Sequence, residues 1–511
     1  MPVHPLLPTP TDDYRSDTSV IQSTTEQAIL DLLLPWVQPH LIRPNTIQLT
    51  QADTDKGNDE NQRVPQQPGS RPISTAVLDR TAHMKYLIPG LNHLAPRFTG
   101  LDASRPWLMY WILNSFSILN LGLNTADRQR AIDTVLSFQH PQGGFGGGPG
   151  HLAHLAPTFS SISTLVSLLG AADDELVRDT WARVDIGQMY NWMLTLKQPD
   201  GSFIMQQNGE VDVRATYCAL CVASLLNFLT PDLARGLPEF IAGCQTYEGG
   251  LGSASQLVNI STRSHRIPLG EAHGGYTSCG LLSHFLIKSL EGSLPVVPLD
   301  YPACLRWLSL MQALPIEGGG FRGRTNKLVD GCYSWWCGGV FPVINALIAE
   351  SPSSTLDEPL SDEIRLGTYD RQGLQEYILL ISQGQPPGPV PGGLRDKPSA
   401  PVDHYHTHYV LSGLSSAQHQ HYFSTSEMDS LGTAFDLRSA PPTFIGIEET
   451  LGQATARARA VYSRALAWLT LEHDQLVIGA AQNGLIPIHP VFNMRTPYVK
   501  RAMDHFYLAP P

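Results

Sequence analysis

The sequence predicts an all-α protein that is built of helix hairpins joined by Gly-rich turns. Apolar residues recur every three and four positions in long segments such as 106–121, 214–229 and 275–290, which is the period of a helix and not of a strand. These segments alternate with turns that are rich in glycine, at 141–150, 198–203, 244–253, 315–323 and 389–398. The repeat is roughly 50–75 residues long, which leaves room for two helices in each unit.

The repeats fit two arrangements of helix pairs, and the pattern alone does not choose between them. Helix pairs can stack into an open solenoid, which is an architecture that mostly binds partners. They can also close into a ring, which would bring the Gly-rich turns to one rim around a single cavity. Glycine suits such tight turns because it adopts positive φ without steric cost.

Composition divides the chain into two parts. Residues 1–75 are predicted to form an N-terminal extension that is partly disordered, since most of this stretch is rich in Asp, Gln, Asn, Pro and Ser. Within it, residues 24–37 have helical spacing and begin with threonines that suit a helix cap. Residues 76–511 are predicted to form a helical domain, with a polar insert near 351–363.

The overall charge and the cysteine content exclude several classes of function. The formal net charge is −12, so the chain is a poor candidate for binding nucleic acid or an anionic membrane. No apolar stretch is long enough to span a bilayer, and the N-terminus lacks the pattern of a secretory signal. The seven cysteines are an odd number at low density, which indicates free thiols in a reducing compartment. We therefore expect a soluble, cytoplasmic protein.

One short segment, GRTNKLVDGCYSWW (323–336), contains a candidate metal-ligand pair. Asp330 and Cys332 stand two residues apart, so a loop or the first turn of a helix could direct both side chains to one ion. Two ligands are too few, and we expect the third to be a histidine. Segment 402–421 offers His404, His406, His408, His419 and His421, and spacing alone does not select among them. Three protein ligands would leave the open coordination position that catalytic zinc requires.

Other residues in the repeats suit an anionic and an apolar ligand. His273, Arg324, Lys327 and Tyr333 could hold a diphosphate if the ring gathers them at one rim, although a lone Arg or Lys is usually a solvated surface charge. Aromatic residues are dense in the helical segments, where they either pack in the core or line an apolar tunnel. They are Trp107, Tyr110, Trp111, Tyr217, Trp335, Trp336, Tyr405 and Tyr409.

Segments across roughly residues 80–425 closely resemble the β subunits of protein farnesyltransferases, in the order in which that family has them. They are LDASRPWLMYWIL, GGFGGGPGHLAHLAPT, QPDGSF, GEVDVRATYC, EAHGGYTSCG, GRTNKLVDGCYSWW and YHTHYVLSGLSSAQH, with a weaker likeness at IPIHPVFNM (486–494). The resemblance implies an α/α toroid, an α6/α6 barrel of helix hairpins, that is bound to an α subunit in an obligate heterodimer. The implied substrates are farnesyl diphosphate and CaaX-terminated proteins such as small GTPases.

The resemblance also assigns roles to residues by their position in these segments. The implied ligands of one Zn²⁺ are Asp330, Cys332 and His406. The implied diphosphate-binding residues are His273, Arg324, Lys327 and Tyr333. The implied isoprenoid pocket is lined by Trp107, Tyr217, Gly275, Tyr276, Cys279, Trp336 and Tyr409. The implied peptide-binding residues are Trp107, Trp111, His154, Ala156, Arg214 and Tyr405. Asp396 matches the carboxylate that is associated with Mg²⁺, which assists the departure of diphosphate.

Two of these positions favour farnesyl as the transferred lipid. Bulky Trp107 and Tyr409 would fill the floor of the cavity and reject a longer chain by overlap. The type I geranylgeranyltransferase β subunits are similar but have a smaller residue in place of this tryptophan, and a lysine in place of Asp396. The expected reaction is therefore transfer of farnesyl to the cysteine of a CaaX motif, and the alternative is a type I geranylgeranyltransferase β subunit.

The sequence departs from the family at two positions, and two other functions are alternatives to a prenyltransferase. His408 stands where the animal enzymes have a cysteine, which adds a possible metal ligand, and Cys337 replaces a polar residue. A terpenoid cyclase on the same barrel would need a DxDD motif, which the sequence lacks. A catalytically inactive helical scaffold would not need Asp330, Cys332 and His406.

Overall fold

The computed structural model describes residues 8–9, 14–36, 73–260, 263–351, 368–383, 392–435, 449–471 and 474–508. Helices dominate these residues, and their strands form two sheets of two strands each. Most of the predicted extension at 1–75, and all of the predicted insert at 351–363 except Ser351, lie outside the described residues. The division into an extension and a domain therefore stays a prediction.

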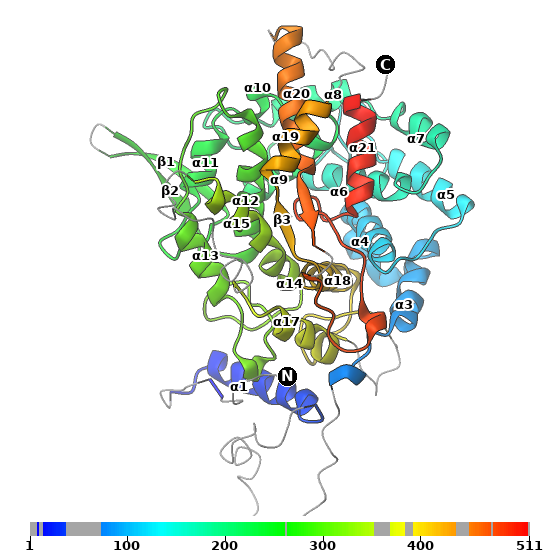
Figure 1. Ribbon diagram of the computed structural model, residues 1–511, viewed down its shortest axis with the longest axis vertical. Coiled ribbons are helices and arrows are strands. Elements are labelled where there is room, and N and C mark those ends of the chain that lie inside the picture. Colours follow the sequence, from blue (N-terminus) through cyan, green and yellow to red (C-terminus); the bar gives the residue numbers. More distant parts are fainter. Residues whose placement is uncertain are drawn as a thin grey trace, which may run out of the picture.

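Inner helices form a closed ring in the described part of the chain (Figure 1). Each of them contacts the next, and the last returns to contact the first. In order around the ring they are α4 (Arg105–Ile118), α6 (Leu155–Leu169), α9 (Val213–Leu225), α12 (Gly274–Ile287), α14 (Tyr333–Trp336) and α18 (His404–Gln418). An open solenoid would keep its first and last helices apart, so the toroid that the resemblance implied is confirmed.

A second set of helices covers the outside of the ring. Helices α3, α5, α11 and α17 pack against α4, α6, α12 and α18, respectively. The outer elements are α3 (Arg80–Asn92), α5 (Thr125–Leu136), α7 (Asp174–Trp181), α8 (Ile186–Thr195), α10 (Pro231–Ala234), α11 (Leu237–Gly243), α13 (Tyr301–Leu310), α15 (Phe341–Ala349) and α17 (Arg371–Tyr377). Helices of the inner ring are more deeply buried than helices of the outer set. Inner helix α9 buries every residue except Arg214, whereas outer helix α7 buries only Val177, Thr180 and Trp181.

The C-terminal part of the chain packs over one end of the toroid (Figure 1). It contains α19 (Thr425–Ala434), α20 (Leu451–Leu466) and α21 (Thr496–Leu508), and the short strands β3 (His421–Phe423) and β4 (Trp468–Thr470). Arg464 on α20 is nearly buried and makes two hydrogen bonds of 2.8 Å to the carboxylate of Glu350, which follows α15. Its Nε also donates to the carbonyl of Phe285 on α12, so one guanidinium ties α20 to the ring.

Short helical turns complete the connections between these elements. They are η3 (Ile73–Thr75), η4 (Pro96–Ser104), η5 (Lys288–Leu290), η6 (Pro315–Glu317), η7 (Gly338–Val340), η8 (Ile378–Ser382) and η10 (Ala481–Asn483). Several Gly-rich turns contain glycines with positive φ, as predicted. Gly392 has a φ of 101°, and a Cβ at this position would lie 2.0 Å from the carbonyl oxygen of Ala82. Only glycine therefore allows this turn to approach the start of α3 so closely.

The N-terminal helix α1 (Asp17–Leu33) packs against the outside of the toroid through η6 and η8. It begins earlier than the predicted range of 24–37, because Ser16 and Ser19 form a capping box that starts the helix at Asp17. It ends before Pro35, whose ring is incompatible with a continued helix. Ile29 and Leu33 are buried, so this part of the predicted extension belongs to the folded body.

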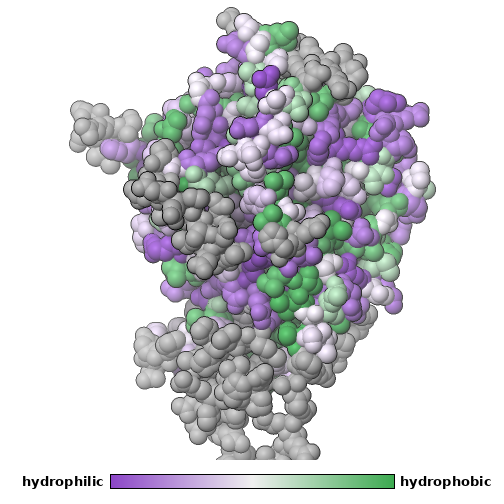
Figure 2. Space-filling model, viewed as in Figure 1, coloured by the Kyte–Doolittle hydropathy of each residue, from purple (hydrophilic) through white to green (hydrophobic). Residues whose placement is uncertain are grey.

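The hairpin of β1 (Ala254–Ile260) and β2 (Arg263–Leu269) was not predicted from the sequence. Its strands pair antiparallel from Ala254 opposite Leu269 to Ile260 opposite Arg263, and it projects from the side of the toroid (Figure 1). Figure 2 shows hydrophilic and hydrophobic residues intermixed over this face of the molecule. Among the described residues, no helix is both long enough and apolar enough to cross a membrane.

Candidate metal centre and adjoining pocket

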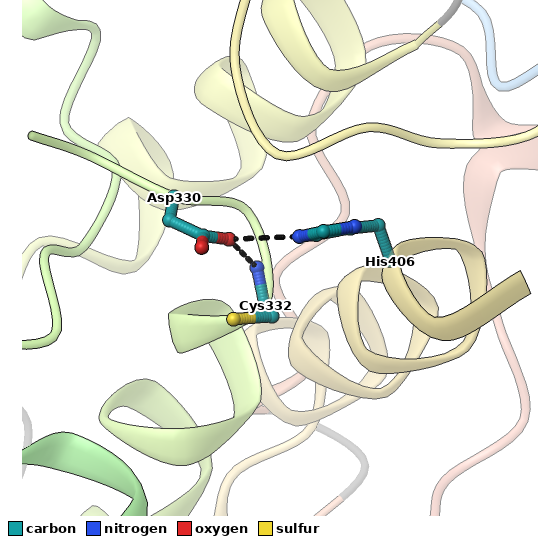
Figure 3. A group of neighbouring side chains, drawn as sticks. All are labelled: Asp330, Cys332 and His406. Atoms are coloured by element: carbon teal, nitrogen blue, oxygen red, sulfur yellow. Dashed lines mark hydrogen bonds and ion pairs between the residues drawn. The ribbon is translucent and has the colours of Figure 1, made fainter. Parts of the chain in front are cut away.

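Three side chains from distant parts of the sequence converge beside the end of α18. Asp330 lies in the loop before α14, Cys332 directly precedes that helix, and His406 lies in the first turn of α18 (Figure 3). One ligand atom from each residue lies within 4.8 Å of the other two. The His406 Nε2 atom is 3.2 Å from an Asp330 carboxylate oxygen. The predicted set of three ligands is therefore close enough to share one ion.

The loop that carries Asp330 and Cys332 is fixed by backbone hydrogen bonds. The backbone N–H of Cys332 donates to the Asp330 carboxylate at 2.9 Å, which holds the two side chains in one turn. The N–H of Gly331, between them, donates to the carbonyl of Asp396 at 2.7 Å. This contact joins the loop to the segment that precedes α18. A backbone hydrogen bond thereby connects the two segments that supply the candidate ligands.

His406 is oriented by Asp403, which the sequence analysis did not single out. Asp403 is the N-cap of α18, and its carboxylate accepts from the backbone N–H of His406 at 2.7 Å. Its other oxygen lies 2.6 Å from His406 Nδ1. Because Nδ1 donates to this carboxylate, Nε2 is left to face Asp330. An aspartate three residues before a histidine at a helix start is the sequence signal that could have revealed this pair.

The electrostatics of the cluster suit a cation. Burial alone would lower the pKa of His406, but hydrogen bonds to Asp330 and Asp403 outweigh it and raise the pKa to about 9. The two carboxylates therefore favour positive charge at this position, which is the charge that a metal ion would supply. Burial and the neighbouring Asp330 raise the pKa of the Cys332 thiol, and a cation would reverse that effect. A carboxylate, a thiolate and an imidazole form a donor set that fits Zn²⁺.

The other histidines of α18 point away from this cluster. Residues two apart on an α-helix are separated by about 200°, so His404 and His408 share a face that is opposite to His406. The ring of His404 stacks at 5.5 Å on Phe98, and His408 Nε2 lies 3.0 Å from the Asn114 side-chain amide. Among the described residues, the metal-ligand cluster does not include His408. The structure therefore places His408 outside the candidate metal centre.

An apolar pocket of about 430 Å³ adjoins the cluster inside the ring. This volume falls within the range of typical small-ligand sites. It is lined by Trp107, Tyr110, Trp111, Ala156, Phe159, Met205, Arg214, Tyr217, Cys218, His273, Gly275, Tyr276, Cys279, Tyr333, Trp335, Trp336, Tyr405, Tyr409 and Asn493. Tyr405 and Tyr333 belong to this lining and directly neighbour the candidate ligands His406 and Cys332 in the chain. The Tyr405 ring also lies 5.0 Å from the His406 ring, so the pocket and the candidate metal centre adjoin each other.

The structure brings most of the predicted substrate residues together in this lining. All seven residues of the implied isoprenoid pocket line it, as do the implied peptide residues Trp111, Ala156, Arg214 and Tyr405. His154 does not line the pocket, and instead caps α6 by accepting from the Ala156 N–H at 3.1 Å. The site assignments from the sequence did not include Tyr110, Phe159, Met205, Cys218, Trp335 and Asn493, which also line it. Of these six residues, only Tyr110 and Trp335 were among the aromatic residues that the sequence analysis noted.

At one edge of the pocket, His273 and Tyr333 form a hydrogen-bonded pair. The His273 Nε2 atom lies 3.0 Å from the Tyr333 hydroxyl, and His273 Nδ1 accepts from the Gly275 N–H. Burial, together with Arg324 and Arg214, lowers the pKa of His273 to about 4, so the ring is neutral. With Nδ1 accepting, its proton lies on Nε2 and is donated to Tyr333. The Tyr333 hydroxyl proton then remains free for an anionic ligand.

Arg324, Lys327 and Asp396 do not line the pocket. Arg324 forms an ion pair with Glu271, two residues before His273. Lys327 is exposed in the same loop as Arg324. The Asp396 carboxylate pairs with Lys397 at 2.5 Å, and burial and Asp330 raise its pKa. A cation near Asp330 would favour the ionised form of both carboxylates.

Comparisons with known proteins agree with the fold. Residues 78–494 match the prenyltransferase alpha-alpha toroid domain. The protein farnesyltransferase subunit beta of Arabidopsis thaliana is 36% identical over 67% of this chain and 73% of its own length. That of Schizosaccharomyces pombe is 38% identical over 68% of this chain and 80% of its own. The geranylgeranyl transferase type-2 subunit beta of Candida albicans is 29% identical over 51% of this chain and 72% of its own. The chain belongs to the prenyltransferase α/α toroid family and, within it, to the protein farnesyltransferase β subunits.

Proposed function

We propose that this chain is the catalytic β subunit of a heterodimeric, zinc-dependent protein farnesyltransferase that acts in the cytoplasm. Its partner is a prenyltransferase α subunit, and its substrates are farnesyl diphosphate and proteins that end in a CaaX motif, small GTPases among them. Support comes from the family, from the cluster of Asp330, Cys332 and His406, and from the aromatic pocket beside it. The seven cysteines are all free, which is consistent with a reducing compartment.

In this proposal, Asp330, Cys332 and His406 hold one Zn²⁺. When bound, Zn²⁺ supplies a Lewis acid that lowers the pKa of a substrate thiol near it. The residues of this chain orient the metal ligands and the peptide. Asp403 accepts from Nδ1 of His406 and so directs Nε2 toward the ion, and the backbone N–H of Cys332 orients the Asp330 carboxylate. Tyr405 and Trp111 position the peptide beside the cluster.

The pocket orients the isoprenoid and the diphosphate edge assists the leaving group. Aromatic rings such as Trp336 and Tyr409, 4.7 Å apart, sheath the apolar chain and exclude water from it. The Tyr333 hydroxyl donates to the diphosphate, and Arg324 and Lys327 neutralise part of its charge. Asp396 would hold the Mg²⁺, which would supply further positive charge to the leaving group. The substrate sulfur forms a bond to C1 of the farnesyl group as the C1–O bond breaks. Diphosphate leaves with the electron pair, and the thiol proton passes to water.

The convergence of the three ligand atoms within 4.8 Å is the observation that carries this proposal. The test is a Cys332→Ala variant that is coexpressed with an α subunit and purified as the heterodimer. We expect the variant to lose zinc and peptide farnesylation while it retains binding of farnesyl diphosphate. Elemental analysis measures the metal, and labelled farnesyl diphosphate measures binding and transfer.

Cys337→Ala is the matched control for this experiment. Cys337 is a buried free thiol five residues further along the chain, and it is not part of the candidate cluster. We expect the control heterodimer to keep its zinc. Unchanged zinc content in the Cys332→Ala heterodimer would contradict the proposal, as would equal losses in both variants.

A further inference from the structure

The segment with weak likeness to the family, at 486–494, contains a loop that contributes to the lining of the pocket. Residues 489–494, here called the closing loop, are buried throughout. The His489 N–H donates to the Met494 carbonyl at 2.7 Å, and the Asn493 N–H donates back to the His489 carbonyl at 3.0 Å. His489 Nδ1 accepts from the Val491 N–H at 3.1 Å, so the imidazole also holds the turn together. The closing loop is therefore a compact, internally bonded unit.

Inner helices of the toroid hold the closing loop from several sides. The Tyr217 hydroxyl on α9 donates to the Val491 carbonyl at 2.8 Å. The Tyr110 hydroxyl on α4 donates to the Asn493 carbonyl at 3.0 Å. Both tyrosines line the pocket, so their phenol tips reach from the apolar space to the loop beyond it. The loop therefore lies across the end of the pocket that these two hydroxyls mark.

The departure at His408 belongs to the same arrangement. The Asn114 amide nitrogen donates to the Asn493 carbonyl at 2.7 Å and lies 3.0 Å from His408 Nε2. The orientation of the Asn114 amide is determined, because the carbonyl of Asn493 requires the amide nitrogen as its donor. Asn114 is one turn beyond Tyr110 on α4, about 6 Å further along the helix axis. His408 therefore supports the anchor of the closing loop.

Asn493 is the one closing-loop residue that lines the pocket. Its backbone φ is 53°, the left-handed conformation that asparagine tolerates better than most residues. The residue is 2% exposed, and its side-chain oxygen has no hydrogen-bond partner among the described residues. The buried side-chain oxygen is thus enclosed between the closing loop and its surroundings, and Asn493 adds a rigidly held polar residue to the pocket lining.

We infer that Asn493, presented by the closing loop, sets an upper limit on the length of the isoprenoid. The inference rests on the proposed function and assigns the same pocket an additional specificity-determining residue. A farnesyl chain ends before Asn493, whereas a chain with one more isoprene unit must overlap this residue and the loop that holds it. This overlap acts against the longer substrate and leaves the shorter one unaffected.

The test is an Asn493→Gly variant in the heterodimer, since glycine keeps the left-handed backbone and removes the amide. The readout is the ratio of kcat/KM for geranylgeranyl diphosphate to kcat/KM for farnesyl diphosphate. We expect the ratio to rise by about tenfold or more, the scale on which pockets discriminate apolar chains. Asn227→Gly is the matched control, because Asn227 is also buried, left-handed (φ 60°) and has an unpartnered side-chain oxygen, but lies outside the pocket lining. We expect the control to keep the wild-type ratio.

A second measurement on the wild-type heterodimer does not depend on a variant that folds. A farnesyl diphosphate with a diazirine on its terminal isoprene unit is cross-linked by light, and the labelled peptide is identified by mass spectrometry. Labelling of residues 489–494, Tyr110 or Tyr217 would support the inference. Labelling near His273 would overturn it, as would an unchanged ratio in an active Asn493→Gly enzyme. Farnesyl transfer by the wild type tests the proposed function separately, because an inactive wild type would refute that proposal and not the position of the loop.

Discussion

The carboxylate of Asp403 provides a sensitive test of how the metal centre is built. It accepts from the backbone N–H of His406 at 2.7 Å and from His406 Nδ1 at 2.6 Å. In Asp403→Asn, the amide oxygen can still cap the helix, because asparagine is as good an N-cap as aspartate. The amide NH₂ would then face Nδ1 and favour the tautomer with its proton on Nε2. That proton would lie on the atom that the proposal assigns to zinc.

The size of the effect follows from the exposure of the carboxylate. Loss of a hydrogen bond that orients a metal-binding histidine typically costs about 10- to 100-fold in metal affinity. The Asp403 side chain is 46% exposed, so water can replace part of the lost interaction. We therefore expect the lower end of this range, about a tenfold weaker affinity, or about 1.4 kcal/mol. Competition against a fluorescent zinc chelator, on the purified heterodimer at neutral pH, measures it.

Asp370→Asn is the matched control for this experiment. Asp370 caps α17 through the Gly373 N–H at 2.9 Å, and it contacts no candidate metal ligand in the described structure. We expect wild-type zinc affinity in this control. Equal zinc affinity in Asp403→Asn and Asp370→Asn would refute the reasoning, because the orientation of His406 would then not depend on its carboxylate partner.

Three further changes probe the fold, the diphosphate edge and the pocket floor. Arg464→Ala should destabilise the chain by about 3 kcal/mol in denaturant unfolding, since it removes a nearly buried guanidinium and leaves the Glu350 carboxylate with only Lys288, at 3.9 Å. Exposed Arg183→Ala, which breaks an ion pair with Asp133, should cost less than about 1 kcal/mol, and similar losses in the two variants would contradict this. Tyr333→Phe should slow single-turnover farnesyl transfer by roughly 10- to 100-fold through loss of a hydrogen bond to a charged group; an unchanged rate would remove Tyr333 from the diphosphate site. Trp107→Thr should increase use of geranylgeranyl diphosphate in a competition assay, and an unaltered product ratio would argue against a steric floor.

The helix period and the turn chemistry made the all-α class predictable, but not the closure of the ring. Contacts between adjacent repeats are the same in an open and a closed array, and only the contact of α18 with α4 distinguishes them. The β1–β2 hairpin was missed because the helical repeats dominate the sequence around it. The helix α1 was predicted too late in the sequence, because the capping box at Ser16 starts a weakly amphipathic helix.

The candidate site was predictable to different degrees for physical reasons. Asp330 and Cys332 are neighbours in the chain, so their local spacing was informative. The choice of His406 among histidines two apart needed the direction of α18, which places His404 and His408 on the opposite face. Asn493 reaches the pocket through a loop that long-range hydrogen bonds hold in place, and no local pattern in the sequence reports such contacts.

The central claim is that three side chains of this chain bind one zinc ion. Anomalous X-ray diffraction from crystals of the heterodimer, recorded on both sides of the zinc absorption edge, tests it most directly. We expect one strong peak within coordination distance of Asp330 Oδ, Cys332 Sγ and His406 Nε2. A zinc-loaded crystal with its peak elsewhere, or with no peak among these three atoms, would contradict the account.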